Sequence, residues 1–259
     1  MKLIKIPFSK GSLGKSEGCF KGPDKVTELI KEFSFSEDKA LPIFDIEQVN
    51  VDQNNLSLTH NNIFKKISEI KNNFIALGGD HSITYSAFKA FAQQFQNPGI
   101  IVFDAHPDLM PPENLDHETY LRKLIEDNVI KKENVILIAA RNWDKEEYKY
   151  IQDNKIKLYS MKNITMEGLT NICDAVMSVA KDWDGLYLSL DIDSVDPAFA
   201  PGTGYTEPAG LTSREMFYLI HRIKLLKNLK GIDIVEVNPD KDINNMTSRL
   251  AAKLCVELY

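Results

Sequence analysis

Short apolar runs alternate with longer segments of helical periodicity along the whole chain. Runs of strand length fall at residues 2–8, 43–51, 73–77, 99–104, 134–140, 155–159, 185–190 and 232–237. Apolar positions three and four residues apart predict helices at residues 23–33, 59–71, 83–95, 118–128, 145–153, 163–181, 213–229 and 247–258. Regular alternation of strand and helix is typical of a mostly parallel sheet with helices on both faces. The pattern therefore predicts an α/β fold.

Polar residues at the predicted helix starts are candidates for N-caps. We expect Thr59 or Asn61 to cap the second helix and Ser82 to cap the third. His60 then stands at a helix start, where we expect its ring to be solvated. His221 has apolar neighbours in the middle of a helix, so a structural role is expected for it.

Composition narrows the class of protein. The 259 residues, 43% of them hydrophobic, fit a single domain, and no repeat or linker divides residues 1–259. The formal charge is −6 and the lysines are spread evenly, so the basic patch of a nucleic-acid-binding protein is missing. Neither a signal peptide nor an apolar run of membrane-spanning length is found. Three widely separated cysteines fit a reducing compartment, and we expect a cytoplasmic protein.

Acidic residues follow directly after three of the apolar runs. The run at 185–190 leads into Asp191, Asp193 and Asp196. Residues i and i+2 of a strand point to the same side, so Asp191 and Asp193 aim two carboxylates at one point. Their repulsion would protonate one of them unless a dication is bound. Capping of a turn or of a following helix would explain a single Asp-x-Asp pair equally well. We expect Asp196 to shape the Asp-Pro turn.

Two further runs end in similar clusters. Residues 73–77 lead into Gly-Gly-Asp-His-Ser (78–82), and residues 99–103 lead into Asp-Ala-His-Pro-Asp (104–108). In parallel sheets, ligands bind beyond the carboxyl ends of the strands. Imidazole and carboxylate ligands together suit Mn, Fe, Co or Zn. The absence of cysteine from these clusters argues against a structural zinc site. The three clusters therefore predict a metal centre.

These segments resemble the three signature motifs of the ureohydrolases, the family of arginases, agmatinases and formiminoglutamases. The third motif is Ser-Leu-Asp-Ile-Asp-Ser-Val-Asp-Pro-Ala-Phe-Ala-Pro-Gly-Thr-Gly (189–204). Glu-Val-Asn-Pro (236–239) looks like a fourth family segment, and Pro-Phe-Ser-Lys-Gly (7–11) resembles an arginase N-terminus. The resemblance covers nearly the whole chain. It implies a three-layer α/β/α fold with about eight strands, usually assembled as a homo-oligomer, a trimer or a hexamer.

The resemblance also implies two manganese ions per subunit. The six ligands that it assigns are His81 and Asp108 for one ion, His106 and Asp193 for the other, and Asp104 and Asp191 as bridges. Four carboxylates against two dications would leave such a centre near neutral. The sequence departs from the family pattern at none of these positions.

The implied activity is hydrolysis of a guanidino C–N bond with release of urea. A water activated by the metal pair would attack the guanidinium carbon, with Asp108 orienting the water and Glu236 pairing with the guanidinium. His117 is implied as the proton shuttle, because Asp-His-Glu-Thr (116–119) resembles the agmatinase segment that carries the family's catalytic histidine. Glu118 stands where the family usually has a small residue, Gly.

The substrate is indicated by two opposing signals. Ala-Ala-Arg-Asn-Trp-Asp (139–144) resembles an arginase segment and would place Asp144 on the α-amino group of arginine. Met110 and Glu113, however, stand where arginases have polar residues for the α-carboxylate, and an acid there would repel a carboxylate. Residues 201–210 also look more like the agmatinases. We therefore expect a small guanidino substrate, agmatine, with arginine as the alternative.

Other functions stay open on sequence alone. A formimino substrate is compatible with the family. A two-metal phosphoesterase or a zinc deacetylase would use a similar centre, although deacetylases have fewer acidic ligands. Glu118 also leaves open a ureohydrolase-like protein that binds a ligand without catalysis.

Overall fold

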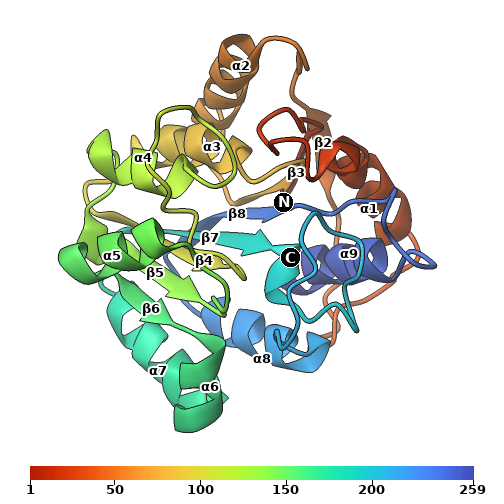
Figure 1. Cartoon of the computed structure of the whole chain (residues 1–259). Helices are drawn as coiled ribbons and strands as arrows, with labels where there is room; N and C mark the ends of the chain where they lie inside the picture. Colours follow the sequence, from red (N-terminus) through yellow and green to blue (C-terminus); the bar gives the residue numbers. More distant parts are fainter.

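The computed structural model describes residues 1–259 and contains one eight-stranded sheet, in which all neighbouring strands are parallel (Figure 1). The strands are β1 (Lys2–Ile6), β2 (Asp45–Gln48), β3 (Phe74–Gly78), β4 (Pro98–Phe103), β5 (Val135–Ile138), β6 (Lys157–Tyr159), β7 (Gly185–Asp191) and β8 (Leu229–Val235). Their order across the sheet is β2-β1-β3-β8-β7-β4-β5-β6. The number of strands and their parallel arrangement agree with the sequence prediction.

Helices cover both faces of the sheet (Figure 1). They are α1 (Gly22–Ile30), α2 (Leu56–Ser68), α3 (Ile83–Ala92), α4 (Tyr120–Glu126), α5 (Lys145–Asn154), α6 (Met161–Glu167), α7 (Leu169–Ala180), α8 (Ser213–Ile223) and α9 (Met246–Leu258). One core cluster lies between one face of the sheet and helices α2, α3, α4 and α5. A second core cluster lies between the other face and helices α1, α6, α7, α8 and α9. The three-layer α/β/α fold is thereby confirmed.

The central strands are buried on both faces, which explains their continuous apolar runs. In β4, Ile100 and Val102 belong to the core under α2 to α5, whereas Ile101 and Phe103 belong to the opposite core. All four side chains are fully buried. Burial of such a side chain contributes roughly 1.5–3 kcal/mol to folding, so a polar substitution on either face of this strand would be strongly destabilising.

The connections at the centre of the sheet open a crevice. The chain leaves β3 and β4 toward α3 and α4 on one face, and it leaves β7 and β8 toward α8 and α9 on the other. The pairs β3–β8 and β7–β4 are neighbours in the sheet. Because neighbouring strands send their helices to opposite faces, the space beyond their carboxyl ends stays open, as in other doubly wound sheets.

Several helix boundaries differ from the prediction. Asn55 caps α2 by accepting a hydrogen bond from Leu58 N at 3.0 Å, so the cap predicted at Thr59 or Asn61 is wrong. Ser82 precedes α3 but forms no side-chain cap. Asp80 Oδ1 instead accepts a hydrogen bond from Ser82 N at 3.0 Å.

Two predicted helices are too long. The helix predicted at 163–181 is interrupted at Gly168, whose φ of +87° ends α6 before α7 begins. The helix predicted to reach residue 229 ends at Ile223, and β8 already begins at Leu229. No glycine or proline lies between Ile223 and Leu229 to mark this end. Thr212 caps α8 in a capping box with Glu215.

His60 is buried, which contradicts the expectation of a solvated ring. Only 7% of the residue is exposed, and Nδ1 lies 2.9 Å from Ser86 Oγ. The ring contacts the aromatic rings of Phe8 and Tyr85 edge-on. Because α2 begins earlier than predicted, His60 lies inside the helix and faces α3. Burial lowers the pKa of His60 to about 4.

The buried ring predicts acid sensitivity of the fold. Below the ordinary pKa of 6.5 the unfolded chain binds a proton that the folded chain does not bind until the pH approaches 4. Unfolding is therefore favoured as the pH falls, and His60 should cost about 2 kcal/mol of stability between pH 7 and pH 5. Urea unfolding of the wild type and His60→Gln at both pH values measures this difference. An identical pH dependence in the two proteins would contradict the assignment.

Candidate metal centre

The carboxyl ends of three central strands bring the predicted ligands together. His81 follows β3, three ligands follow β4, and the last two lie at the end of β7. The six side chains are His81, Asp104, His106, Asp108, Asp191 and Asp193, and all of them line one cavity. Since these strands are parallel and belong to the four adjacent strands β3-β8-β7-β4, their ends meet at one edge of the sheet.

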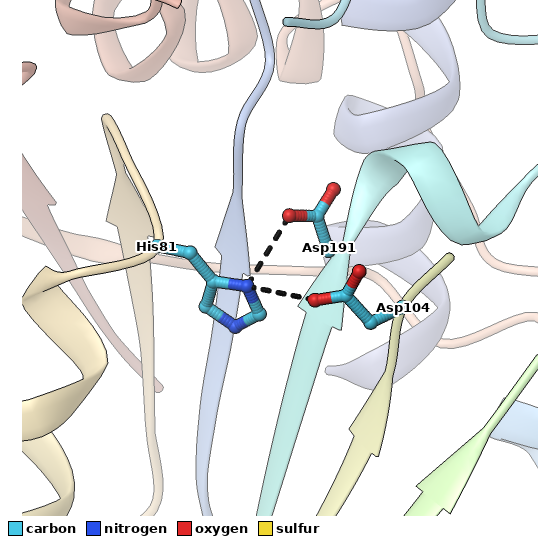
Figure 2. Close-up of side chains that lie close together, drawn as sticks. All are labelled: His81, Asp104 and Asp191. Carbon is cyan, nitrogen blue, oxygen red and sulfur yellow. Dashed lines mark ion pairs between the residues drawn. The ribbon is translucent and has the colours of Figure 1, made fainter. Parts of the chain in front are cut away.

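The first cluster is centred on His81 (Figure 2). Its Nδ1 lies 3.0 Å from Asp104 Oδ2, 3.2 Å from Asp108 Oδ2 and 3.2 Å from Asp191 Oδ2. Figure 2 shows the ring facing the carboxylates of Asp104 and Asp191, which come from β4 and β7. One nitrogen and several carboxylate oxygens thus converge on one point.

A second cluster adjoins the first. His106 Nδ1 lies 3.2 Å from Asp193 Oδ2 and 3.5 Å from Asp104 Oδ1. Asp104 therefore turns one oxygen to each histidine, as expected of a bridging ligand. Asp191 is paired with His81 alone, and its Oδ1 accepts a hydrogen bond from Asp193 N at 2.8 Å, as Asp104 Oδ1 does from His106 N at 2.7 Å. His81, Asp104 and Asp191 form one group with metal-ligand spacing, and Asp104, His106 and Asp193 form the other.

The donor atoms fit a pair of dications. His81 Nδ1 and Asp104 Oδ2 are buried and have no hydrogen-bond partner in the protein, which is costly unless another group binds them. Burial and the charge of Asp193 raise the pKa of Asp191 well above its usual range. Burial and the charge of Asp104 do the same to the pKa of Asp108. Bound dications would relieve this repulsion between carboxylates.

Hydrogen bonds behind His81 fix its orientation. Ser189 Oγ donates to Asp233 Oδ1 at 2.6 Å, and His81 Nε2 lies 2.9 Å from Ser189 Oγ. Because the serine proton is used by Asp233, its oxygen can accept the Nε2 proton of His81; Tyr120 Oη also lies 2.9 Å from that nitrogen. In this tautomer, Nδ1 has a free lone pair that faces the carboxylates. Such an outer shell is common behind histidine ligands of metals.

A close backbone approach positions His81. Gly79 N donates to Ile6 O at 3.0 Å, and Asp80 N donates to Phe8 O at 2.8 Å. A Cβ at Gly79 would lie only 1.6 Å from Phe8 O, so this position requires glycine. The end of β1 thereby holds the segment that carries His81.

His117 and Glu236 form a buried pair beside the first cluster. His117 Nδ1 lies 3.2 Å from Glu236 Oε1, which also accepts a hydrogen bond from His81 N at 2.9 Å. Burial lowers the pKa of His117, but the hydrogen bond to Glu236 outweighs it, and the pKa rises to about 9. Burial raises the pKa of Glu236, but the hydrogen bond from His117 brings it below its usual value. The pair is therefore an imidazolium and a carboxylate at neutral pH.

Two residues of the site have left-handed backbone conformations. The φ angle is +54° at Asp108 and +63° at Glu236. A residue other than glycine in this region costs about 1 kcal/mol. Residues held in this way are concentrated at functional sites, and here the turn directs both side chains into the cavity.

The cavity above the clusters has a volume of about 320 Å³ and strongly acidic walls. Eight of its sixteen lining residues are Asp or Glu, three are His, and none is Lys or Arg. Four of the acids belong to the metal clusters. The other four are Glu118, Asp144, Glu147 and Glu236. A cationic ligand is therefore favoured over an anionic one.

The structure places the two other predicted substrate-binding residues differently. Asp144 lines the cavity, but it is also the N-cap of α5, where its Oδ1 accepts a hydrogen bond from Glu146 N at 2.8 Å. Glu113 is exposed and does not line the cavity, so the structure does not bring it together with the other predicted site residues. Glu113 N donates to Pro111 O at 3.0 Å in a turn of the loop after β4.

Several residues of the cavity were missed from sequence. Tyr205 packs its ring against those of His106 and His117. Glu147 accepts hydrogen bonds from Leu109 N and Asp144 N, both at 2.9 Å, and so ties the loop after β4 to α5. Tyr205 lies in the segment 201–210 that resembles the agmatinases, and Glu147 completes a capping-box pattern with Asp144, but neither pattern points to the cavity. Glu118 had a more direct signal, as an acid where the family has a small residue.

The remaining sequence predictions concern residues outside the cavity. His221 Nε2 lies 2.8 Å from Glu257 Oε2 and links α8 to α9, in line with a structural role. Asp196 accepts hydrogen bonds from Ala198 N and Gly210 N at 2.9 and 3.0 Å, as expected of a turn residue. All three cysteines are free and buried. None of the helices combines the length and the apolar character of a membrane span.

Comparison with known proteins relates this geometry to a family. A family model described as "Arginase: Arginase family" matches residues 1–259. An arginase of Staphylococcus aureus (strain COL) is 35% identical over 253 residues, spanning 90% of this chain and 81% of that protein. A formimidoylglutamase of Halalkalibacterium halodurans is 32% identical over 266 residues, spanning 96% and 83%. The crystal structure of formimidoylglutamase from Bacillus subtilis matches with a TM-score of 0.94 at 27% identity, covering 99% of this chain and 85% of that one.

Proposed function

This chain belongs to the arginase family, and we propose that it is a two-metal hydrolase that cleaves agmatine to putrescine and urea. The observation that carries the proposal is the cavity itself, which has two His/Asp clusters at its base and no Lys or Arg in its walls. Membership of the family argues against the phosphoesterase and deacetylase alternatives. The relatives reported above are named for arginine and formimidoylglutamate chemistry, so the assignment to agmatine rests on the walls of the cavity.

We assign two manganese ions to the clusters. The ligands would be His81, Asp104, His106, Asp108, Asp191 and Asp193. Imidazole and carboxylate donors without sulfur suit manganese. When bound, a metal pair lowers the pKa of a water so that hydroxide is available near neutral pH. Assembly as a trimer or a hexamer is part of the proposal and rests on the resemblance of the sequence.

Glu236 orients the guanidinium in this proposal. Its Oε1 already accepts hydrogen bonds from His81 N and His117 Nδ1. Its Oε2 would be the oxygen that accepts hydrogen bonds from guanidinium N–H groups, with the Ser16 hydroxyl close to the same carboxylate. Because Glu236 is only 4% exposed, the pair would form at the closed end of the cavity, beside the metal clusters.

In this proposal His117 donates a proton to the leaving amine, and Asp108 orients the attacking water. His117 donates from Nδ1 to Glu236, so the imidazolium carries its second proton at Nε2, a buried atom without a hydrogen-bond partner. That proton can pass to the leaving amine, which needs one when the C–N bond breaks. Asp108, whose Oδ2 faces the first cluster, would accept a hydrogen bond from the attacking water.

The charge of the substrate's tail distinguishes agmatine from the other guanidino substrates. A carboxylate tail would need a cation as its partner. The guanidinium of the nearby Arg141 already donates hydrogen bonds to backbone carbonyls, among them Asp193 O and Glu207 O, both at 2.7 Å. An ammonium tail is attracted by the acids of the walls. Arginine is the second candidate, because Asp144 lines the cavity as the arginase-like segment implies.

Urea release tests the proposal. Manganese-loaded protein should be assayed side by side with agmatine, arginine and guanidinobutyrate, and formamide release should be measured with formiminoglutamate. We expect kcat/KM for agmatine to exceed that of the other compounds at least about tenfold, the effect of one favourable charge contact. A preference for arginine or for formiminoglutamate would contradict the assignment to agmatine. No turnover of any compound with two metals bound would contradict the hydrolase.

A further inference from the structure

Four acids of the cavity lie outside the metal clusters, and two of them accept hydrogen bonds from the backbone. Glu147 accepts a backbone hydrogen bond at each carboxylate oxygen, from Leu109 N and Asp144 N. Asp144 accepts hydrogen bonds from the first turn of α5 in a capping box. Glu236 lies at the closed end, bound to His117. Glu118 alone has a carboxylate at the open end that no backbone N–H engages.

The backbone around Glu118 is held on both sides. Glu118 N donates to Asp116 Oδ1 at 3.0 Å, and Met110 N donates to Glu118 O at 3.0 Å. The preceding residue is fixed too, because His117 N donates to Gly11 O at 3.0 Å. The position of the side chain at the cavity is therefore set by the fold.

The carboxylate of Glu118 lies beside Tyr205 at the cavity. Its Oε1 accepts a hydrogen bond from Tyr205 Oη at 3.2 Å and lies 3.9 Å from His117 Nε2. The other oxygen has no partner, and 39% of the side chain is exposed. No Lys or Arg forms an ion pair with it. A substrate that reaches past His117 toward solvent must therefore pass a negative charge that no Lys or Arg offsets.

We propose that Glu118 is the specificity-determining residue of this site, which selects substrates whose tail ends in a primary ammonium and rejects those with a carboxylate. The inference rests on the proposed function, which places the guanidinium at Glu236. It replaces Glu113 and Asp144 as the acids responsible for the choice of tail. A side chain at this position also narrows the open end of the cavity, where a glycine would leave it wide.

A set of compounds with one guanidinium end and three tails tests the inference. These are agmatine with a cationic tail, butylguanidine with a neutral one and guanidinobutyrate with an anionic one. Urea release should give kcat/KM of each for the manganese-loaded wild type, Glu118→Gln and Glu118→Lys, and calorimetry should give the Kd of each compound that is not turned over. Binding is thus followed whether or not turnover occurs.

Glu118→Gln should weaken agmatine binding about tenfold and leave butylguanidine within about twofold, because only the charged tail loses a contact. Glu118→Lys should reverse the order of agmatine and guanidinobutyrate. Metal content should stay unchanged in both variants. Glu113→Gln, an acid of the same loop outside the cavity, is the matched control and should bind all three compounds like the wild type.

The outcomes separate this inference from the proposed function. Urea release from agmatine with equal losses for all three tails, or with none, would overturn the role of Glu118 and leave the hydrolase standing. Loss of charge selectivity in a protein that releases no urea would support Glu118 and overturn the hydrolase. Failure of the wild type to distinguish the three tails would overturn the inference outright.

Discussion

Replacement of Asp191 by Asn is expected to weaken metal binding by more than about 100-fold and to abolish urea release, while the protein stays folded. Asp191 Oδ2 lies 3.2 Å from His81 Nδ1 in the first cluster. Changes to outer-shell partners of metal ligands already cost 10–100-fold in affinity, and this variant removes a charge from the cluster itself. Metal content after dialysis, urea release and the thermal midpoint should be measured together.

The fold should tolerate Asp191→Asn for an electrostatic reason. Burial and the charges of Asp193 and Asp104 raise the pKa of Asp191, so the metal-free cluster is stabilised when one carboxylate is neutralised. The amide keeps an oxygen to accept the hydrogen bond from Asp193 N. The metal-free variant should therefore melt no lower than the metal-free wild type.

Asp196→Asn is the matched control for this prediction. Asp196 belongs to the same loop, but its carboxylate accepts hydrogen bonds from Ala198 N and Gly210 N and is absent from the clusters. The control should keep both metals and full activity. Full metal content in Asp191→Asn would refute its assignment as a ligand.

The convergence of the six candidate metal ligands at one edge of the sheet could be predicted because it follows from local patterns. Each central strand is buried on both faces and is therefore visible as an apolar run, as β4 shows. Asp104, His106 and Asp108 come directly after that run, and a strand places alternate side chains on one side. Parallel topology then brings the strand ends to one edge of the sheet. None of these steps depends on contacts between distant parts of the chain.

The loops could not be predicted in the same way, because long-range hydrogen bonds decide their course. Glu113 and Glu118 are both acids of the segment after β4, and local sequence does not tell which one faces the cavity. The choice is made by contacts such as His117 N with Gly11 O, more than one hundred residues apart in the chain. His60 is a similar case, since its burial depends on the packing of α2 against α3.

Replacement of His117 by Asn is expected to reduce kcat by about 10²–10⁴-fold, the usual contribution of a general acid, with metal binding unchanged. The ring contacts Glu236 and Glu118 and none of the six predicted ligands, so the clusters should stay intact. Loss of activity with both metals present separates this variant from Asp191→Asn. His221→Asn, which changes a histidine between α8 and α9, should leave kcat and metal content as in the wild type.

The pH profile of kcat distinguishes a proton donor from a residue that only shapes the cavity. A donor must be protonated, so wild-type kcat should fall as the pH rises through the pKa of His117, which is about 9. Glu236 is the group that raises this pKa against the effect of burial. In Glu236→Gln the alkaline decline of the residual kcat should therefore move to lower pH, and in His117→Asn it should vanish. An alkaline decline that persists at the same pH in both variants would show that another group supplies the proton to the leaving amine.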